Sequence, residues 1–181
     1  MDLTEHCISS EILAQGDFLT VKKDIVSLAN GNISQREYVM HPGAVVIVPL
    51  LANGNVLLER QFRYPLQQVF IELPAGKIDP DEDVLKTGQR ELLEETGYSA
   101  QKWVKLGVQH PCIGYSNEVI HVYLATNLAA GRHQRDEDEM LEVFDVKLEQ
   151  CLEMIHHQEI TDSKTIVALF LADKYLQKNG Q

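Results

Sequence analysis

Cysteine is scarce in this sequence, and its three cysteines lie far from one another. Cys7, Cys112 and Cys151 are separated by long stretches of chain. Small secreted domains are rich in cysteine, and structural zinc sites bring cysteine or histidine residues close together in sequence. The cysteine content therefore predicts unpaired thiols and a reducing environment, for which we expect a cytoplasmic location.

Long hydrophobic runs are absent as well. No apolar segment approaches the roughly 20 residues that a helix needs to cross a bilayer. The first ten residues, MDLTEHCISS, are acidic and lack the apolar stretch of a secretory signal. We therefore expect neither a membrane span nor a membrane partner.

Positive charge is the third feature that the sequence has little of. It contains 16 Lys and Arg against 27 Asp and Glu, which gives a formal net charge of −11. Binding to nucleic acid needs clustered cations that neutralise phosphates, so we expect no nucleic-acid partner. A small substrate that carries phosphate is still compatible with this charge if a metal ion reverses the sign of the local field.

The hydrophobic pattern predicts an N-terminal β-hairpin followed by one larger domain. Residues 17–28 and 35–40 alternate as strands about a turn at 29–32. A lone hairpin is marginal in water, so this one needs a packing partner such as a second subunit. We assign residues 1–40 to this hairpin region, which we expect to form a dimer, and residues 41–181 to the main domain.

Strands and helices are both predicted in the main domain. AVVIVPLL (44–51) is a buried strand, and Asn53-Gly54 is a hairpin signal that precedes a return strand at 55–63. Further predicted strands cover 69–73, 103–109, 118–128 and 142–148, and predicted helices cover 84–96, 148–157 and 163–176. This order of elements indicates an α+β fold, a mixed α/β sandwich.

The predicted helix at 84–96 carries three glutamates on one face. Glu91, Glu94 and Glu95 have the i, i+3, i+4 spacing that places side chains next to one another. Like charges at these positions destabilise the helix by a few tenths of a kcal/mol per pair, and nothing offsets this cost if the face is merely solvated. Mg²⁺ prefers such oxygen ligands and commonly bridges them to substrate phosphates. Taken alone, the pattern leaves open a solvated acidic helix and a metal site.

The surrounding residues favour the metal site. Residues 76–98 match, without a gap, the Nudix signature G-x(5)-E-x(7)-R-E-U-x-E-E-x-G-U, in which U is apolar or aromatic. The matching residues are Gly76, Glu82, Arg90, Glu91, Leu92, Glu94, Glu95, Gly97 and Tyr98. The chain therefore resembles the Nudix hydrolases, which cleave a nucleoside diphosphate linked to another moiety with the help of divalent metal ions.

This resemblance implies roles for several residues of the segment. Glu91 and Glu95 are expected as the principal metal ligands, together with Glu94 and the backbone carbonyl of Ala75. The expected ion is Mg²⁺, with Mn²⁺ as a substitute.

Three further residues of the segment are expected to support the site. Arg90 and Glu82 are expected to fix the helix and the preceding loop through an ion pair. Gly76 is expected to allow a tight backbone turn.

The resemblance extends to the ADP-ribose pyrophosphatase branch of the family over about residues 35–170. The segments that carry it are HPGAVVIVPL, ERQFRYP, ELPAGKID and DEDEMLEV…EITDSKTIVAL. It implies hydrolysis of ADP-ribose to AMP and ribose 5-phosphate, and a homodimer in which the N-terminal hairpin is exchanged.

Residues outside the signature complete the expected site. In this branch a carboxylate on an acidic loop activates the attacking water, which points to Glu139 or Glu137; the alternative is a solvated acidic loop. Arg63 is expected to contact the substrate, and Arg36 and Glu118 are further candidates for such contacts.

Two aromatic residues have alternative roles. Phe18 or Tyr38 is a candidate for stacking on a base, but we favour packing in the core or the hairpin as the role of each.

One departure from the branch leaves the substrate open. Relatives that cleave ADP-ribose often carry a Pro-Gly step in a loop after the signature, whereas this chain has Cys112-Ile113-Gly114, with a proline only at Pro111. The alternatives are a GDP-mannose or other nucleotide-sugar pyrophosphatase, and a catalytically silent domain that only binds nucleotide. The intact glutamates argue against the silent domain.

Overall fold

The computed structural model describes residues 1–131 and 140–180. The chain divides into two compact units: Met1–Gly43 with His110–Glu118 form the first, and Ala44–Gln109 with Val119–Gln181 form the second. Within the described ranges, none of the helices has both the length and the apolar character needed to cross a membrane.

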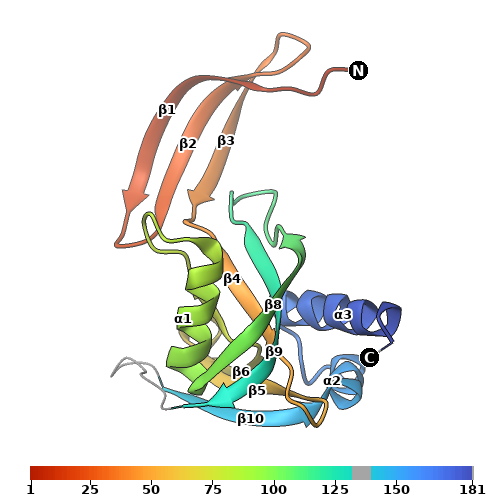
Figure 1. Cartoon of the computed structure of the whole chain (residues 1–181). Helices are drawn as coiled ribbons and strands as arrows, with labels where there is room; N and C mark the ends of the chain where they lie inside the picture. Colours follow the sequence, from red (N-terminus) through yellow and green to blue (C-terminus); the bar gives the residue numbers. More distant parts are fainter. Residues whose placement is uncertain (132–139, 181) are drawn as a thin grey trace. The chain divides into compact units, whose positions relative to one another are not determined.

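The first unit is built on a three-stranded antiparallel sheet (Figure 1). Its strands, in spatial order, are β1 (His6–Gln15), β2 (Thr20–Ser27) and β3 (Ile33–Met40). β2 and β3 correspond to the predicted hairpin, but β1 was not predicted. Its pairing with β2 shifts register twice, between Cys7 and Ser9 and between Ile12 and Ala14. These irregularities interrupt the alternation by which a strand is recognised in sequence.

The segment His110–Glu118 packs at the end of this sheet. The backbone N–H of Val39 donates to the carbonyl of Tyr115 at 2.8 Å, and the backbone N–H of His41 donates to Asn117 Oδ1 at 2.7 Å. The loop that departs from the ADP-ribose pyrophosphatase pattern therefore belongs to the first unit, far in sequence from the strands it contacts.

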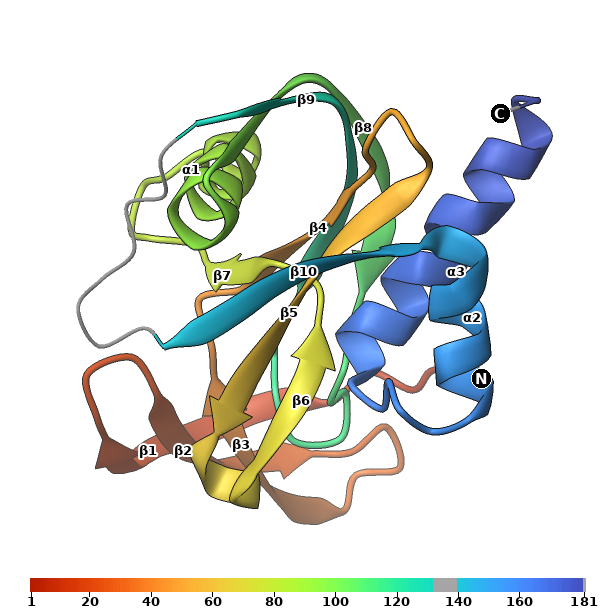
Figure 2. The same ribbon diagram turned by 90° about the horizontal axis from the view of Figure 1, so that it is seen from below.

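The second unit contains two sheets, a four-stranded one of order β7-β4-β9-β8 and a three-stranded one of order β10-β5-β6 (Figure 2). The strands are β4 (Ala44–Pro49), β5 (Asn55–Arg63), β6 (Gln68–Glu72), β7 (Ala75–Lys77), β8 (Tyr98–Gln109), β9 (Ile120–Ala130) and β10 (Leu141–Lys147). The helices are α1 (Val84–Thr96), α2 (Leu148–His156) and α3 (Ser163–Lys178). This mixture of sheets and helices confirms the predicted fold class.

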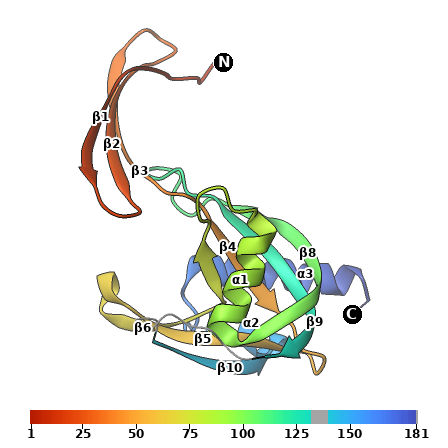
Figure 3. The same cartoon turned by 60° about the vertical axis from the view of Figure 1, so that its left-hand side comes forward.

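β4 is the centre of the core because both of its faces are buried. Val45 and Ile47 pack with Leu92 of α1, whereas Val46 and Val48 share a core cluster with residues of β5 and α3. α1 and α3 accordingly cover opposite faces of the four-stranded sheet (Figure 3). A strand buried on both faces has a continuous apolar sequence, as β4 does.

In this region one prediction was wrong, and one strand was not predicted. β4 and β5 do not form a hairpin, although the turn between them is present: they pair only at Leu50 and Val56 and lie in different sheets. β4 instead pairs with β7 and β9, and β5 pairs with β6 and β10. β7 was missed because three residues after a proline are too few to show a period.

Candidate active site

Both ends of α1 are capped, and these caps fix where the helix, and with it the acidic face, begins and ends. The side chain of Asp83 accepts hydrogen bonds from the N–H groups of Leu85 and Lys86 at 3.0 and 3.1 Å, which caps the first turn. Gly97 ends the helix with φ 75°, a backbone conformation that costs glycine little, and its N–H donates to Leu93 O at 2.9 Å. The helix therefore has the predicted bounds.

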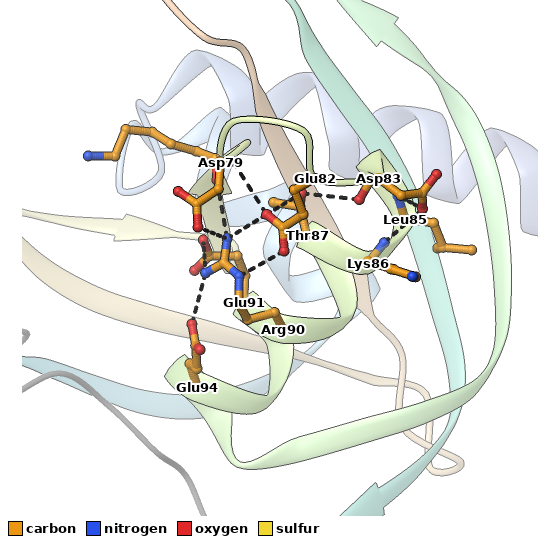
Figure 4. A network of polar contacts seen from close by, with 10 residues as sticks. Asp79, Glu82, Asp83, Leu85, Lys86, Thr87, Arg90, Glu91 and Glu94 are labelled. Carbon is orange, nitrogen blue, oxygen red and sulfur yellow. Dashed lines mark hydrogen bonds and ion pairs between the residues drawn. The ribbon is translucent and has the colours of Figure 1, made fainter. Parts of the chain in front are cut away.

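Arg90 is the hub of a polar network along this face (Figure 4). Its Nε and Nη2 donate to the two carboxylate oxygens of Glu82, both at 3.0 Å. Its Nη1 donates to Glu91 at 2.8 Å and to Glu94 at 3.0 Å, and its Nη2 also reaches the carbonyl of Lys77 at 3.3 Å. The ion pair predicted between Arg90 and Glu82 is therefore present, and Arg90 also binds two of the helix glutamates.

This network shifts the titration of its members. Hydrogen bonds from Arg90 lower the pKa of Glu82 to about 2, against the opposing effect of burial, and a hydrogen bond from the hydroxyl of Thr87 at 2.8 Å lowers it further. The same contacts with Glu82, and the charge of Glu91, raise the pKa of Arg90. Both partners are therefore charged at neutral pH, and Arg90 compensates part of the acidic face.

Glu91 lies against the backbone of β7 at Gly76. A Cβ atom built on Gly76 would lie 1.8 Å from both Cδ and Oε1 of Glu91, and Glu91 is only 9% exposed. Real Cβ atoms do not approach other atoms so closely, so only glycine permits this position of the Glu91 carboxylate. The glycine of the signature is thus required for a close approach between β7 and α1.

Glu95 lies against the same strand, one helical turn further along. It is 2% exposed, and its Oε2 accepts the backbone N–H of Ala75 at 3.0 Å. Glu94 is the most accessible of the three, with a side chain 34% exposed. α1 and β7 therefore bring together Ala75, Gly76 and the three glutamates.

The oxygen donors at this site suit a hard divalent cation. Among the described residues, no three His, Cys, Asp or Glu side chains are gathered in the geometry of a metal cluster. Nη1 of Arg90 lies within hydrogen-bonding distance of both Glu91 and Glu94, and so takes part of the coordination that these carboxylates could offer. The chemistry of the site fits a metal ion, although its carboxylates are arranged around Arg90.

The other candidate residues lie at different places in the fold. Arg63, at the end of β5, makes a two-pronged ion pair with Glu72. In the first unit, Arg36 pairs with Glu5, and a carboxylate oxygen of Glu118 lies 3.6 Å from Nδ1 of His41.

The two aromatic candidates lie in the first unit. The Tyr38 hydroxyl donates to Asp24 at 2.9 Å, and Phe18 is 52% exposed, with its ring edge-to-face with His41. Glu137 and Glu139, the candidates for the base, lie outside the described residues.

Sequence reasoning did not single out Glu72. It is 2% exposed at the end of β6, and its cross-strand neighbour Glu59 is 1% exposed. Buried carboxylates are rare unless they are paired with cations. The signal that could have found Glu72 is a single acidic residue in the otherwise apolar strand VFIEL.

Comparison with known proteins agrees with this geometry. A family model described as "NUDIX domain" matches residues 40–168. The chain belongs to the Nudix family. Gly76, the Arg90 network and the glutamates of α1 are thus the Nudix segment of a Nudix domain.

Individual Nudix proteins match over nearly the whole length of the chain. An ADP-ribose pyrophosphatase of Bacillus subtilis is 38% identical over 177 residues, 97% of this chain and 94% of the relative. A GDP-mannose pyrophosphatase of Klebsiella pneumoniae is 30% identical, covering 99% of this chain and 95% of the relative. A crystal structure of an ADP compounds hydrolase has the same fold, with a TM-score of 0.89, 24% identity, and 99% and 98% of the two chains covered.

Gly76→Ala tests the close approach between β7 and α1. The added methyl group displaces the Glu91 carboxylate, and we expect the free energy of unfolding to fall by about 1–3 kcal/mol, as for other overpacked sites. Urea denaturation measures this loss. Gly114→Ala is the control because a Cβ there meets nothing within 4 Å. Equal stability of the two variants, or no relief of the loss on adding Glu91→Ala, would contradict this packing.

The Glu82–Arg90 pair predicts a dependence of stability on pH. The pKa of Glu82 is lowered in the folded protein from 4.5 to about 2, so its stabilisation is full above pH 4.5 and is lost as the pH falls towards 2. We expect Glu82→Gln to cost about 1 kcal/mol at pH 7, since the pair is partly exposed, and progressively less below pH 4.5. Urea denaturation from pH 3 to 7 measures the difference, with Glu153→Gln on the surface of α2 as control. A cost that does not change with pH would contradict the assignment.

Proposed function

We propose that this chain hydrolyses the pyrophosphate bond of ADP-ribose to AMP and ribose 5-phosphate. The observation that carries the proposal is the Nudix arrangement of Glu91, Glu94 and Glu95 beside the backbone at Ala75-Gly76. Similarity to an ADP-ribose pyrophosphatase over 97% of the chain supports the choice of substrate.

The residues proposed to hold metal are Glu91, Glu94, Glu95 and the carbonyl of Ala75. We propose Mg²⁺ as the natural ion, with Mn²⁺ able to replace it. When bound, such ions neutralise the diphosphate and stabilise the charge that develops on the leaving phosphate. A chain with a net charge of −11 needs added positive charge to bind an anionic substrate.

The side chains around the carboxylates have positioning roles in this proposal. Gly76 lets the Glu91 carboxylate lie close against the backbone of β7, and the N–H of Ala75 donates a hydrogen bond that fixes one oxygen of Glu95. Arg90 orients Glu91 and Glu94 by donating a hydrogen bond to each, and Glu82 anchors Arg90 from the preceding loop. Such supporting residues matter because a ligand must be held in its productive geometry.

The reaction itself is a substitution at phosphorus by water. The water oxygen bonds to one phosphorus of the diphosphate, and the bridging P–O bond breaks. We propose that the carboxylate of Glu139 or Glu137 accepts the water proton as general base. Arg63 is proposed to bind a substrate phosphate through its guanidinium, and Arg36 and Glu118 remain predicted substrate contacts.

GDP-mannose is the second candidate substrate. The GDP-mannose pyrophosphatase of Klebsiella pneumoniae is 30% identical to the chain, and the loop at Cys112-Ile113-Gly114 lacks the Pro-Gly step frequent in relatives that cleave ADP-ribose. Hydrolysis of GDP-mannose would use the same carboxylates, so the two candidates differ in the sugar and base and share the reaction at the diphosphate.

We propose that the protein is a homodimer. All ten residues of β1 are exposed, and the first unit carries several exposed large apolar side chains, namely Ile8, Ile12, Leu13, Phe18, Ile33 and Met40. Three strands need a covered apolar face for stability, and an uncovered edge strand invites pairing with another chain. A second copy of this chain is the partner that the proposal assigns to this surface.

We propose a cytoplasmic location. All three cysteines are free thiols in the structure, and Cys151 is buried. Free thiols suit a reducing compartment.

Glu95→Gln tests the proposed chemistry. We expect more than about a 100-fold loss of AMP release from ADP-ribose with Mg²⁺, and weaker Mn²⁺ binding by calorimetry, because an amide is a poorer ligand than a carboxylate. Glu153→Gln, which changes an exposed glutamate of α2, should match the wild type. Full turnover by Glu95→Gln, or wild-type turnover in EDTA, would contradict the proposed site. A wild type that releases no product would indicate the silent binding domain.

Sedimentation equilibrium tests the homodimer. We expect the wild type to sediment as a dimer, and the double variant Ile8→Lys, Ile12→Lys to shift towards monomer because charge is introduced on the apolar surface of β1. Val167→Lys, at an exposed apolar position of α3, is the control and should remain dimeric. A wild type that stays monomeric across the concentration range would refute the dimer.

A further inference from the structure

A buried carboxylate in the second unit is shared by two cations. Oε1 of Glu72 accepts Nε of Arg63 at 2.7 Å, and Oε2 accepts Nη2 of the same guanidinium at 2.8 Å. Nζ of Lys164 also donates to Oε2 of Glu72. Burial raises the pKa of Glu72, but the hydrogen bonds and charges of Arg63 and Lys164 outweigh this effect and leave the pKa below its ordinary value. Glu72 is therefore an ionised group at neutral pH.

Lys164 is held on its other side by the cap of α3. Asp162 Oδ2 accepts Nζ of Lys164 at 2.9 Å, and it also accepts the N–H and hydroxyl of Thr165 at 3.0 and 2.7 Å. The hydroxyl oxygen of Thr165 in turn accepts the N–H of Leu73 at 2.9 Å. The segment DSKT at the start of α3 is thus tied to the end of β6 at two successive residues, Glu72 and Leu73.

Arg63 has a different environment from Lys164. The side chain of Arg63 is 42% exposed, whereas that of Lys164 is 15% exposed. The two parallel hydrogen bonds to Glu72 fix the plane of the guanidinium. Nη1 of Arg63 makes no hydrogen bond to any described residue, so it can donate to an incoming anion. Arg63 is therefore an accessible donor whose orientation is set by a buried anion.

We propose that Lys164 is a positioning residue for the hydrolysis, holding Glu72 so that Glu72 orients Arg63 towards a substrate phosphate. The inference rests on the proposed function and on the proposed contact between Arg63 and the substrate. It gives a role to the segment EITDSKT (159–165), in which Lys164 lies 92 residues after Glu72 in the sequence and contacts it only through the fold.

The electrostatics explain why a cation is needed at position 164. Nζ of Lys164 lies between two carboxylates, those of Glu72 and Asp162, and bonds to both. Glu59 is a further buried carboxyl group, directly across from Glu72 in the β5–β6 register. Without the ammonium group, Glu72 and Asp162 repel each other at close range. Glu72 then moves, and the plane of the Arg63 guanidinium moves with it.

Lys164→Met tests the proposal by kinetics on the whole protein. We expect kcat/KM for ADP-ribose to fall by about 10- to 100-fold, as for other residues that orient a ligand-binding group. Lys174→Met is the control, because Lys174 is an exposed lysine of the same helix. If Lys164 acts through Arg63, the double variant Arg63→Ala, Lys164→Met is no less active than Arg63→Ala alone. Additive losses in the double variant would overturn the proposal.

A second readout does not depend on activity. The ¹⁵N-labelled Arg63 Nε–H signal, assigned by its loss in Arg63→Lys, should exchange slowly with solvent in the wild type and in Lys174→Met. In Lys164→Met, the Arg63 Nε–H should exchange with solvent at least about tenfold faster. Lys164→Gln should show the same increase, and it replaces Lys164→Met in this test if the methionine variant does not fold. Unchanged exchange would overturn the proposal. A wild type inactive on both ADP-ribose and GDP-mannose would refute the proposed function, and the exchange rates would still decide whether Lys164 positions Arg63.

Discussion

The site depends on one guanidinium among carboxylates. Arg90 donates to Glu82, Glu91 and Glu94, and the acidic face of α1 is stable because this charge is fixed within it. A mobile lysine could neutralise the same charge, but a planar fork also fixes the direction of each carboxylate. Charge compensation and positioning are thus combined in one residue, in a protein whose net charge is −11.

The second constraint is the distance between α1 and β7. Gly76 lets the Glu91 carboxylate approach the backbone, and Ala75 donates to Glu95. β7 is held in place by pairing with β4, whose two faces are buried under α1 and α3. The same core that stabilises the second unit therefore positions its carboxylates, and the end of β6 is tied to α3 just before β7 begins.

Local signals allowed the bounds of α1 to be predicted at about 84–96, as observed, because a glycine such as Gly97 is a helix stop that can be recognised in the sequence. The contact of Arg90 with Glu82 was also predictable from the Nudix signature. That β5 pairs with β6 and β10, and not with β4, could not be predicted. A turn signal does not show which sheet the next strand joins. The contact between Glu72 and Lys164 joins residues 92 apart, and only the fold brings them together.

Product analysis of the wild-type protein tests the central claim most directly. Equal concentrations of ADP-ribose and GDP-mannose are offered together with Mg²⁺, and the products are separated by chromatography. The account predicts that AMP and ribose 5-phosphate form faster than any product of GDP-mannose. Faster release of GMP and mannose 1-phosphate, or no turnover of either compound, would contradict it.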